Sequence, residues 1–174
     1  MEEVILDAII EALRTVTATR FFRSERGYQG RFYCALQKAL DKRGVLRDGV
    51  ILEMEYQKKG GHHGMTQRPD IILHIPVEES GEVVYENNFA VLALKRRASS
   101  NKAQDDFRKL DEMCKVLHYP LALFINIDSG EHHMRCYTGL FLNRVHAFAI
   151  RSEEGTLRII HAWHEKGSLR ECEE

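Results

Sequence analysis

The sequence predicts an α/β protein in which helices flank a mixed β-sheet. Apolar residues recur at helical spacing over the first 42 residues and then, from residue 50 onward, follow the pattern of strands. A second helical segment, 101–117, separates two strongly apolar runs. Because parallel strands need such a crossover and antiparallel strands need only a turn, an antiparallel pair followed by a parallel strand is expected.

Two helices are expected at the start of the chain. Residues 2–20 carry apolar side chains at helical spacing, such as Ile5 and Ile9. A second helix is expected over 25–42, where Ser24 is a good N-cap. Gly44 provides a stop just beyond its end.

The remaining chain alternates between strand patterns and one helix. The run 88–97 is apolar on both faces, which predicts a central strand covered on both sides. The helix 101–117 carries Asp105 and Asp106 near its positive N-terminal end, where acids stabilise the dipole. The tail, 165–174, is expected to fray. Strands are expected over 50–57, 69–76, 88–97, 119–127, 144–151 and 157–163.

Composition indicates one globular domain spanning 1–174, with 44% hydrophobic and 29% charged residues. The formal net charge of -1 argues against a protein that coats nucleic acid non-specifically. The four cysteines form no Cys-x-x-Cys motif, which favours free thiols. The acidic start and the lack of a membrane-length apolar run predict a cytoplasmic protein.

Two residues at strand ends point to chemistry. Asp70 follows Pro69 at the start of one expected strand, and Lys95 lies near the end of the next. Ala93 is two residues before Lys95, so both side chains share a face. Converging carboxylates form a hard oxygen site for Mg²⁺, and a nearby lysine can orient water or neutralise charge on a phosphate. An acid at position 93 would complete such a site.

Pro69-Asp70, a hairpin turn and an apolar strand closing on x-x-Lys95 resemble the PD-(D/E)xK nuclease superfamily. The resemblance covers roughly residues 20–128. It implies the restriction-endonuclease-like fold, a mixed β-sheet flanked by helices with an αβββαβ core, here extended by C-terminal strands. It also implies a metal-binding role for Asp70 and a catalytic role for Lys95. Glu25, at the start of the second helix, matches a further acid of many members, although an acid there also stabilises the helix dipole.

Position 93 departs from the family pattern, because Ala93 stands where the family has Glu or Asp. Three explanations are open. An engineered Glu→Ala change, which would leave this chain catalytically inactive, is favoured, since Asp70 and Lys95 remain together around it. The second explanation is that the chain is a natural relative of the nucleases that binds without cleaving. The third is migration of the acid to another position, such as Glu86 or a helix residue.

Several other residues are expected near this site. Tyr28 and Gln29 could line it. Glu53 and Glu55 belong to an alternating strand, from which one could reach the same site, although a solvent-facing position is favoured for both. The histidine pairs His62-His63 and His132-His133 match no compact zinc motif. Two basic clusters flank the site and are expected to contact phosphates. They are Lys58, Lys59, His62, His63, Arg68, Arg96, Arg97 and Lys102.

The resemblance implies a metal-dependent endonuclease that uses Mg²⁺ or Mn²⁺ and acts on nucleic acid, with DNA favoured over RNA. A homodimer or a partner protein is expected, because cutting both strands of a duplex usually needs two sites. Bacterial defence follows from family analogy alone. The alternative is a non-catalytic module that binds nucleic acid or serves as a structural subunit.

Overall fold

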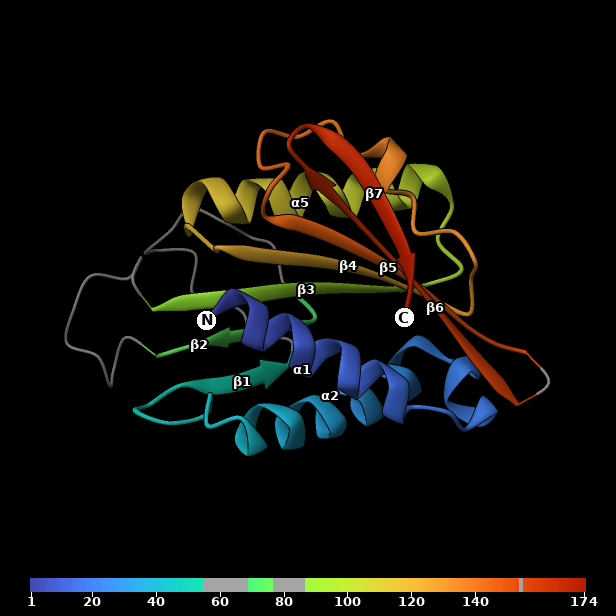
Figure 1. Cartoon of the computed structure of the whole chain (residues 1–174), viewed down its shortest axis with the longest axis horizontal. Coiled ribbons are helices and arrows are strands. Elements are labelled where there is room, and N and C mark those ends of the chain that lie inside the picture. The colour runs from blue at the N-terminus through green and yellow to red at the C-terminus, as the bar shows by residue number, and fades with distance from the viewer. Residues whose placement is uncertain (55–68, 77–86, 154) are drawn as a thin grey trace.

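The computed structural model describes residues 1–54, 69–76, 87–153 and 155–174. Across these residues the strands form one seven-stranded mixed sheet in the order β1-β2-β3-β4-β5-β6-β7. Helix α5 lies on one side of the sheet, and α1 and α2 lie on the other (Figure 1). The elements are α1 (Glu2–Thr15), η1 (Thr19–Arg23), α2 (Glu25–Lys42), β1 (Ile51–Met54), β2 (Ile71–His74), β3 (Asn88–Arg96), α5 (Ser100–Val116), β4 (Leu121–Ile127), η2 (Met134–Cys136), β5 (Val145–Glu153), β6 (Thr156–Glu165) and β7 (Ser168–Glu173).

The sheet topology confirms the predicted crossover. β1, β2 and β3 are antiparallel neighbours, and β3 is parallel to β4 after the crossover through α5. β4 and β5 are also parallel, whereas β6 and β7 return to antiparallel pairing. The order α2-β1-β2-β3-α5-β4 is the expected αβββαβ core, and β5 to β7 extend it.

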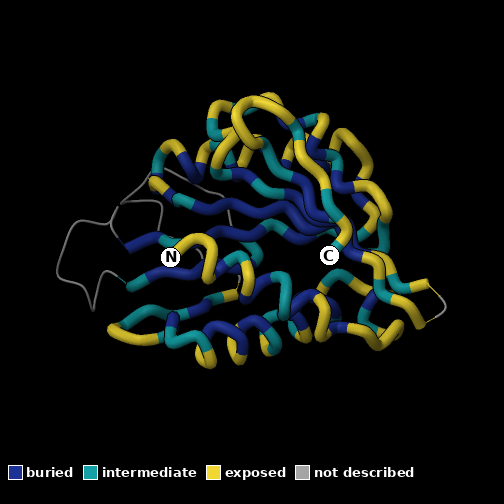
Figure 2. The backbone as a smooth tube through the Cα atoms, in the orientation of Figure 1, coloured by how far each residue is buried: buried dark blue, intermediate teal, exposed yellow. Residues whose placement is uncertain are grey.

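Two hydrophobic cores lie on opposite faces of the sheet. Leu92 and Leu94 of β3 face the core formed with α1 and α2. Val91 belongs to the core formed with α5, and Ala93 packs against that core. Burial on both faces confirms β3 as a central strand, and Figure 2 shows the buried strands between partly exposed helices.

The helix termini follow mostly from local chemistry. Ser24 caps α2, because its hydroxyl accepts a hydrogen bond from the Gly27 N–H at 3.1 Å. Gly44 adopts a φ of 68° just after α2, as a helix stop requires. α1 ends at Thr15 instead of residue 20, and a short 3₁₀ turn follows. The β-branched run Thr15-Val16-Thr17 explains this early end.

The expectation of a frayed tail was wrong. Residues 168–173 form β7, which pairs with β6 along its whole length. The backbone N–H of Glu174 donates to the carbonyl of Ile159 at 3.0 Å, and its carboxylate pairs with Arg14. Mostly exposed side chains made this edge strand look like a solvated tail. Among the helices of the described segments, none combines the length and apolarity needed to cross a membrane.

Candidate active site

Asp70 is fixed to β3 at two points that flank Ala93. Its backbone N–H donates to the Leu92 carbonyl at 3.2 Å. Its Oδ2 accepts a hydrogen bond from the Leu94 N–H at 2.7 Å. The strand register places Asp70 beside this part of β3, because Ile71 pairs with Leu92. The carboxylate of Asp70 therefore lies next to position 93 and on the approach to Lys95.

Lys95 and Glu25 meet at the end of β3. The Lys95 Nζ lies 3.4 Å from the Glu25 Oε1. The other oxygen of Glu25, Oε2, accepts a hydrogen bond from the Arg96 N–H at 2.9 Å. Glu25 starts α2, where the Ser24 cap fixes the helix terminus. This acid therefore links α2 to β3 and holds the lysine head group.

Gln29 supports Asp70 from one turn further along α2. Its Nε2 donates to the Asp70 carbonyl at 3.0 Å, and its side chain is buried. Tyr28, the other residue expected to line the site, is fully buried between Phe22 and Phe32. Tyr28 therefore belongs to the core, and Gln29 orients the backbone that carries Asp70.

The charges of the site act on one another. Burial is the main reason that the pKa of the Asp70 carboxyl is raised. The hydrogen bond from the Leu94 N–H and the charge of Lys95 act to lower this pKa, whereas the charges of Glu25 and Asp106 act to raise it further. Burial acts to lower the pKa of Lys95, but the carboxylates of Glu25, Asp106 and Asp70 outweigh it, so the pKa is raised. Lys95 is therefore a protonated, positively charged group among three acids.

Asp106 is the one residue of this group whose part the sequence did not predict. It lies on α5 and is only 4% exposed. The Lys109 Nζ lies 2.8 Å from its Oδ1. Its Oδ2 is buried and has no hydrogen-bond partner among the described residues. The one signal in the sequence is the adjacent pair Asp105-Asp106, whose position near the start of α5 is explained equally well by the helix dipole.

The basic residues that flank the site differ in how firmly the fold holds their side chains. Arg96 is held by the fold, because its guanidinium donates to the Phe22 carbonyl and to Asp128, each at 2.7 Å. Arg97 also pairs with Asp128, at 2.8 Å, whereas Lys102 is exposed at the start of α5. The predicted residues Lys58, Lys59, His62, His63 and Arg68 lie outside the described residues, as do Glu55 and Glu86.

Glu53 does not reach the site and is not simply solvent-facing, because its Oε2 lies 2.7 Å from the Nε2 of His74. Of the second histidine pair, His132 is buried and contacts Glu171, and His133 contacts the Ala98 carbonyl. Within the described ranges, neither His132 nor His133 belongs to a group of three potential metal ligands.

One group of potential soft-metal ligands lies away from the site, on β6 and β7. Ligand atoms of His161, Cys172 and Glu174 lie within 4.8 Å of one another in the described part of the chain. These side chains already contact one another. The Cys172 thiol donates a hydrogen bond to Glu174 at 3.1 Å, and the Nδ1 of His161 lies 3.3 Å from the same carboxylate. The cysteines are free thiols, as the sequence predicts.

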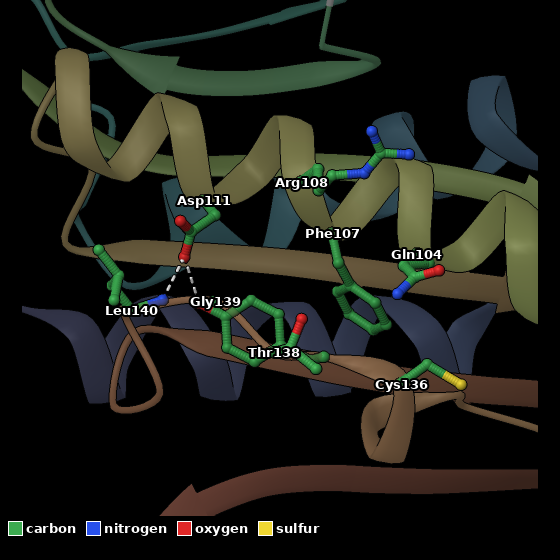
Figure 3. Close-up of a pocket in the computed structure, with 9 residues that line it drawn as sticks. Gln104, Phe107, Arg108, Asp111, Cys136, Thr138, Gly139 and Leu140 are labelled. Carbon is green, nitrogen blue, oxygen red and sulfur yellow. Dashed lines mark hydrogen bonds between the residues drawn. The ribbon is translucent and has the colours of Figure 1, made fainter.

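A cavity of about 270 Å³ lies on another side of α5, between that helix and the segment that precedes β5. Asp111 binds this segment, because its Oδ1 accepts hydrogen bonds from the Tyr137 hydroxyl and the Leu140 N–H (Figure 3). None of Asp70, Lys95 or Glu25 lines this cavity. It is therefore a separate feature from the acid-lysine site.

The acid-lysine site suits a divalent metal in its donor type. Asp70, Glu25 and Asp106 offer hard carboxylate oxygens, which Mg²⁺ prefers to nitrogen or sulfur. Mg²⁺ is usually bound through only one or two carboxylates and keeps several waters, so a closed cage of protein ligands is not required. The Oδ2 of Asp106, which has no hydrogen-bond partner within the described segments, is an observation that fits such an ion.

The described elements include an αβββαβ core, the element order of the restriction-endonuclease-like fold, with Asp70 just before β2 and Lys95 near the end of β3. A structural comparison matches the chain to NucC of P. aeruginosa, solved in its cAAA-bound form. The match has a TM-score of 0.51 and 11% sequence identity, and it covers 99% of this chain and 82% of NucC. At this identity the likeness shows the fold. No protein-family model matches the sequence, and no curated protein is significantly similar to it.

Proposed function

We propose that this protein is a metal-dependent nuclease that hydrolyses phosphodiester bonds in nucleic acid. The observation that carries the proposal is the meeting of Asp70, Lys95 and Glu25 at one edge of a restriction-endonuclease-like sheet. A lysine held by an acid beside a second, half-buried acid fits phosphoryl chemistry, in which negative charge grows on the phosphate oxygens. The likeness to NucC supports the same class of activity.

Each residue has a proposed part in the reaction. Asp70 would hold Mg²⁺ or Mn²⁺, and the bound ion would supply Lewis-acid activation of the phosphate. Lys95 carries a positive charge that stabilises charge developing on the phosphate, because the surrounding acids keep it protonated. Glu25 is a proposed metal ligand from the family resemblance, but its two hydrogen bonds favour a role in positioning Lys95.

DNA is the favoured substrate, and for a duplex a homodimer or a partner protein would place two sites on the two strands. Phosphate contacts are proposed for the basic residues around the site, of which Lys102 is exposed and available. A role in bacterial defence is proposed by analogy with the family. A single domain over 1–174 in the cytoplasm remains part of this proposal.

The test is cleavage of plasmid, linear duplex DNA, single-stranded DNA and RNA, with Mg²⁺, Mn²⁺ or EDTA. We expect metal-dependent cleavage of DNA by the Ala93→Glu protein, and by the unmodified chain only if another carboxylate replaces the acid absent at position 93. Lys95→Ala should lower the rate at least about 100-fold, because the charge that stabilises the transition state is lost. Lys115→Ala is the matched control, since Lys115 is exposed on the last turn of α5.

Ala93→Glu belongs in the same assay. If Ala93 is an inactivating change, only the Ala93→Glu protein cleaves. Cleavage that persists in EDTA or in Lys95→Ala would contradict the proposed site. The second candidate is a non-catalytic nucleic-acid-binding module or structural subunit, which the alanine at position 93 favours. Binding of duplex DNA without cleavage by either protein, with the fold intact, would support that alternative.

A further inference from the structure

We propose that Asp106 of α5 supplies the second carboxylate of the metal site, in place of an acid at position 93. The inference rests on the proposed function, because it assigns a ligand in that same site. It names a divalent cation, Mg²⁺ or Mn²⁺, shared between Asp70 and Asp106. The missing acid on β3 is then replaced by an acid from the helix that covers β3.

The placement of α5 brings Asp106 over the correct part of the sheet. Phe107 and Ala103, which are next to Asp106 and one turn before it, are buried in the core on this face. Ala93 packs against the same core. Asp106 therefore lies on the sheet-facing side of α5, the side toward which residue 93 also points.

The burial of Asp106 requires compensation. A carboxylate that is 4% exposed loses most of its hydration, and one ion pair replaces only part of it. Lys109 contacts Oδ1, at 2.8 Å, and leaves the buried Oδ2 without a hydrogen-bond partner in the described structure. A cation between this oxygen and Asp70 would provide the missing interaction.

Asp105 shows what an ordinary acid on this helix does. It is exposed and pairs with Arg108 one turn further along α5. Such an i, i+3 pair on a helix surface needs no further partner. Asp106 differs from its neighbour in burial and in its unsatisfied oxygen, and these two properties single it out as a ligand.

The alanine at position 93 agrees with this assignment. A glutamate there would project from β3 toward α5 and occupy the space over the sheet. Alanine leaves that space to a carboxylate from the helix. Asp70 lies beside the same space, because its Oδ2 accepts a hydrogen bond from the N–H of Leu94, the residue next to Ala93. Two carboxylates that approach this space, one from α5 and one from the start of β2, attract a cation.

The test measures Mn²⁺ binding directly, by electron paramagnetic resonance and by the metal-dependent rise in melting temperature. Mn²⁺ binding that disappears in Asp70→Asn is assigned to this centre. Mn²⁺ bound at the His161 group would persist in that variant. We expect Asp106→Asn to weaken Mn²⁺ binding at this centre at least about 10-fold. Asp105→Asn, the matched control on the same helix, should leave it unchanged.

A rescue experiment completes the test. Adding Ala93→Glu or Ala93→Asp to the Asp106→Asn protein should restore Mn²⁺ binding, because the acid returns to the family position. Without metal, Asp106→Asn should melt no lower than the unmodified chain, since it removes a poorly compensated buried charge. Loss of binding is then not a consequence of unfolding.

The outcomes separate this inference from the proposed function. Mn²⁺ binding that depends on Asp70 and Asp106 without any cleavage supports the inference and counts against the nuclease. Metal-dependent cleavage with unchanged Mn²⁺ affinity and rate in Asp106→Asn overturns the inference and leaves the nuclease standing. Absence of Mn²⁺ binding at Asp70, with or without duplex DNA, overturns the inference, as does failure of both rescue variants.

Discussion

The carboxylates around Lys95 determine both its protonation state and its position in the site. The carboxylates around it raise its pKa, although burial alone would lower it. A lysine in this state does not remove a proton from water near neutral pH, which favours the proposed role in charge stabilisation. Its position depends on Glu25, whose other oxygen is held by the backbone of Arg96.

Gln29→Leu tests how far the site depends on its supporting residues. The change removes the donor to the Asp70 carbonyl and leaves that carbonyl unpaired in a partly buried place. We expect a loss of about 1–3 kcal/mol in the free energy of unfolding, together with weaker Mn²⁺ binding. Chemical denaturation and metal titration provide the two measurements.

Gln37→Leu is the matched control, because Gln37 is exposed on the same helix. It should change stability by less than about 0.5 kcal/mol. Equal effects of the two substitutions would show that the hydrogen bond from Gln29 to Asp70 has no special role.

Among single residues, the sequence predicted those that can be recognised from their immediate neighbours in the chain. Pro69-Asp70 and Lys95 stand out in the chain, and Glu25 follows a good cap. Gln29 was expected near the site from its place one turn beyond Glu25, but its contact with the Asp70 carbonyl was not. Asp106 could not be found in the same way. Its surroundings depend on how α5 packs on β3, and that contact leaves no periodic signal.

Helix α5 contributes to two separate features through different sides. One side covers β3 and carries Asp106, and another binds the segment before β5 through Asp111. Gly139 lies in that segment, and a Cβ atom at this position would overlap Asp111 and the Tyr137 ring. Only glycine therefore allows this close approach.

Gly139→Ala is expected to destabilise the junction between α5 and β5 by about 1–3 kcal/mol, because Asp111 or Tyr137 must move. Thermal denaturation measures the loss. Gly130→Ala is the control, since a Cβ atom there has open space. If Gly139→Ala were as stable as Gly130→Ala, the packing of this junction would have to be looser than the structure shows.

Elements with a buried stripe or a buried run were predicted well. The strand at 88–97, the helix at 101–117 and the strand at 119–127 all appear near their expected bounds. The tail failed for a physical reason. β7 is an edge strand with mostly exposed side chains, and its partner, not its own composition, makes it a strand.

The whole molecule is expected to lose stability in mild acid through its buried histidines. Burial lowers the pKa of His146 to about 4, and the nearby His161, whose Nε2 lies 2.9 Å from the His146 Nδ1, adds to this. Burial also lowers the pKa of His161, against the pull of Glu174. Both side chains are neutral in the folded protein at pH 7.

The sign of the pH effect follows from proton uptake. An unfolded histidine binds a proton near pH 6.5, whereas His146 in the folded protein resists protonation until about pH 4. The contribution of His146 is complete above pH 6.5 and is lost as pH falls toward 4, up to about 3 kcal/mol. Urea denaturation between pH 4 and 7 measures it.

His146→Gln should flatten this part of the pH profile, because the substituted side chain does not titrate. A profile of His146→Gln with the same slope as that of the unmodified protein would assign the acid sensitivity to other groups.

The contacts that shape the site are largely contacts to the main chain. The Leu94 N–H holds the Asp70 carboxylate, the Asp70 carbonyl accepts from Gln29, and the Arg96 N–H holds Glu25. Main-chain groups are present whatever residue occupies a position, so the geometry tolerates extensive replacement of the side chains between these points. Such a site can drift in sequence until profile searches no longer detect it, while its three-dimensional likeness to a distant protein stays measurable.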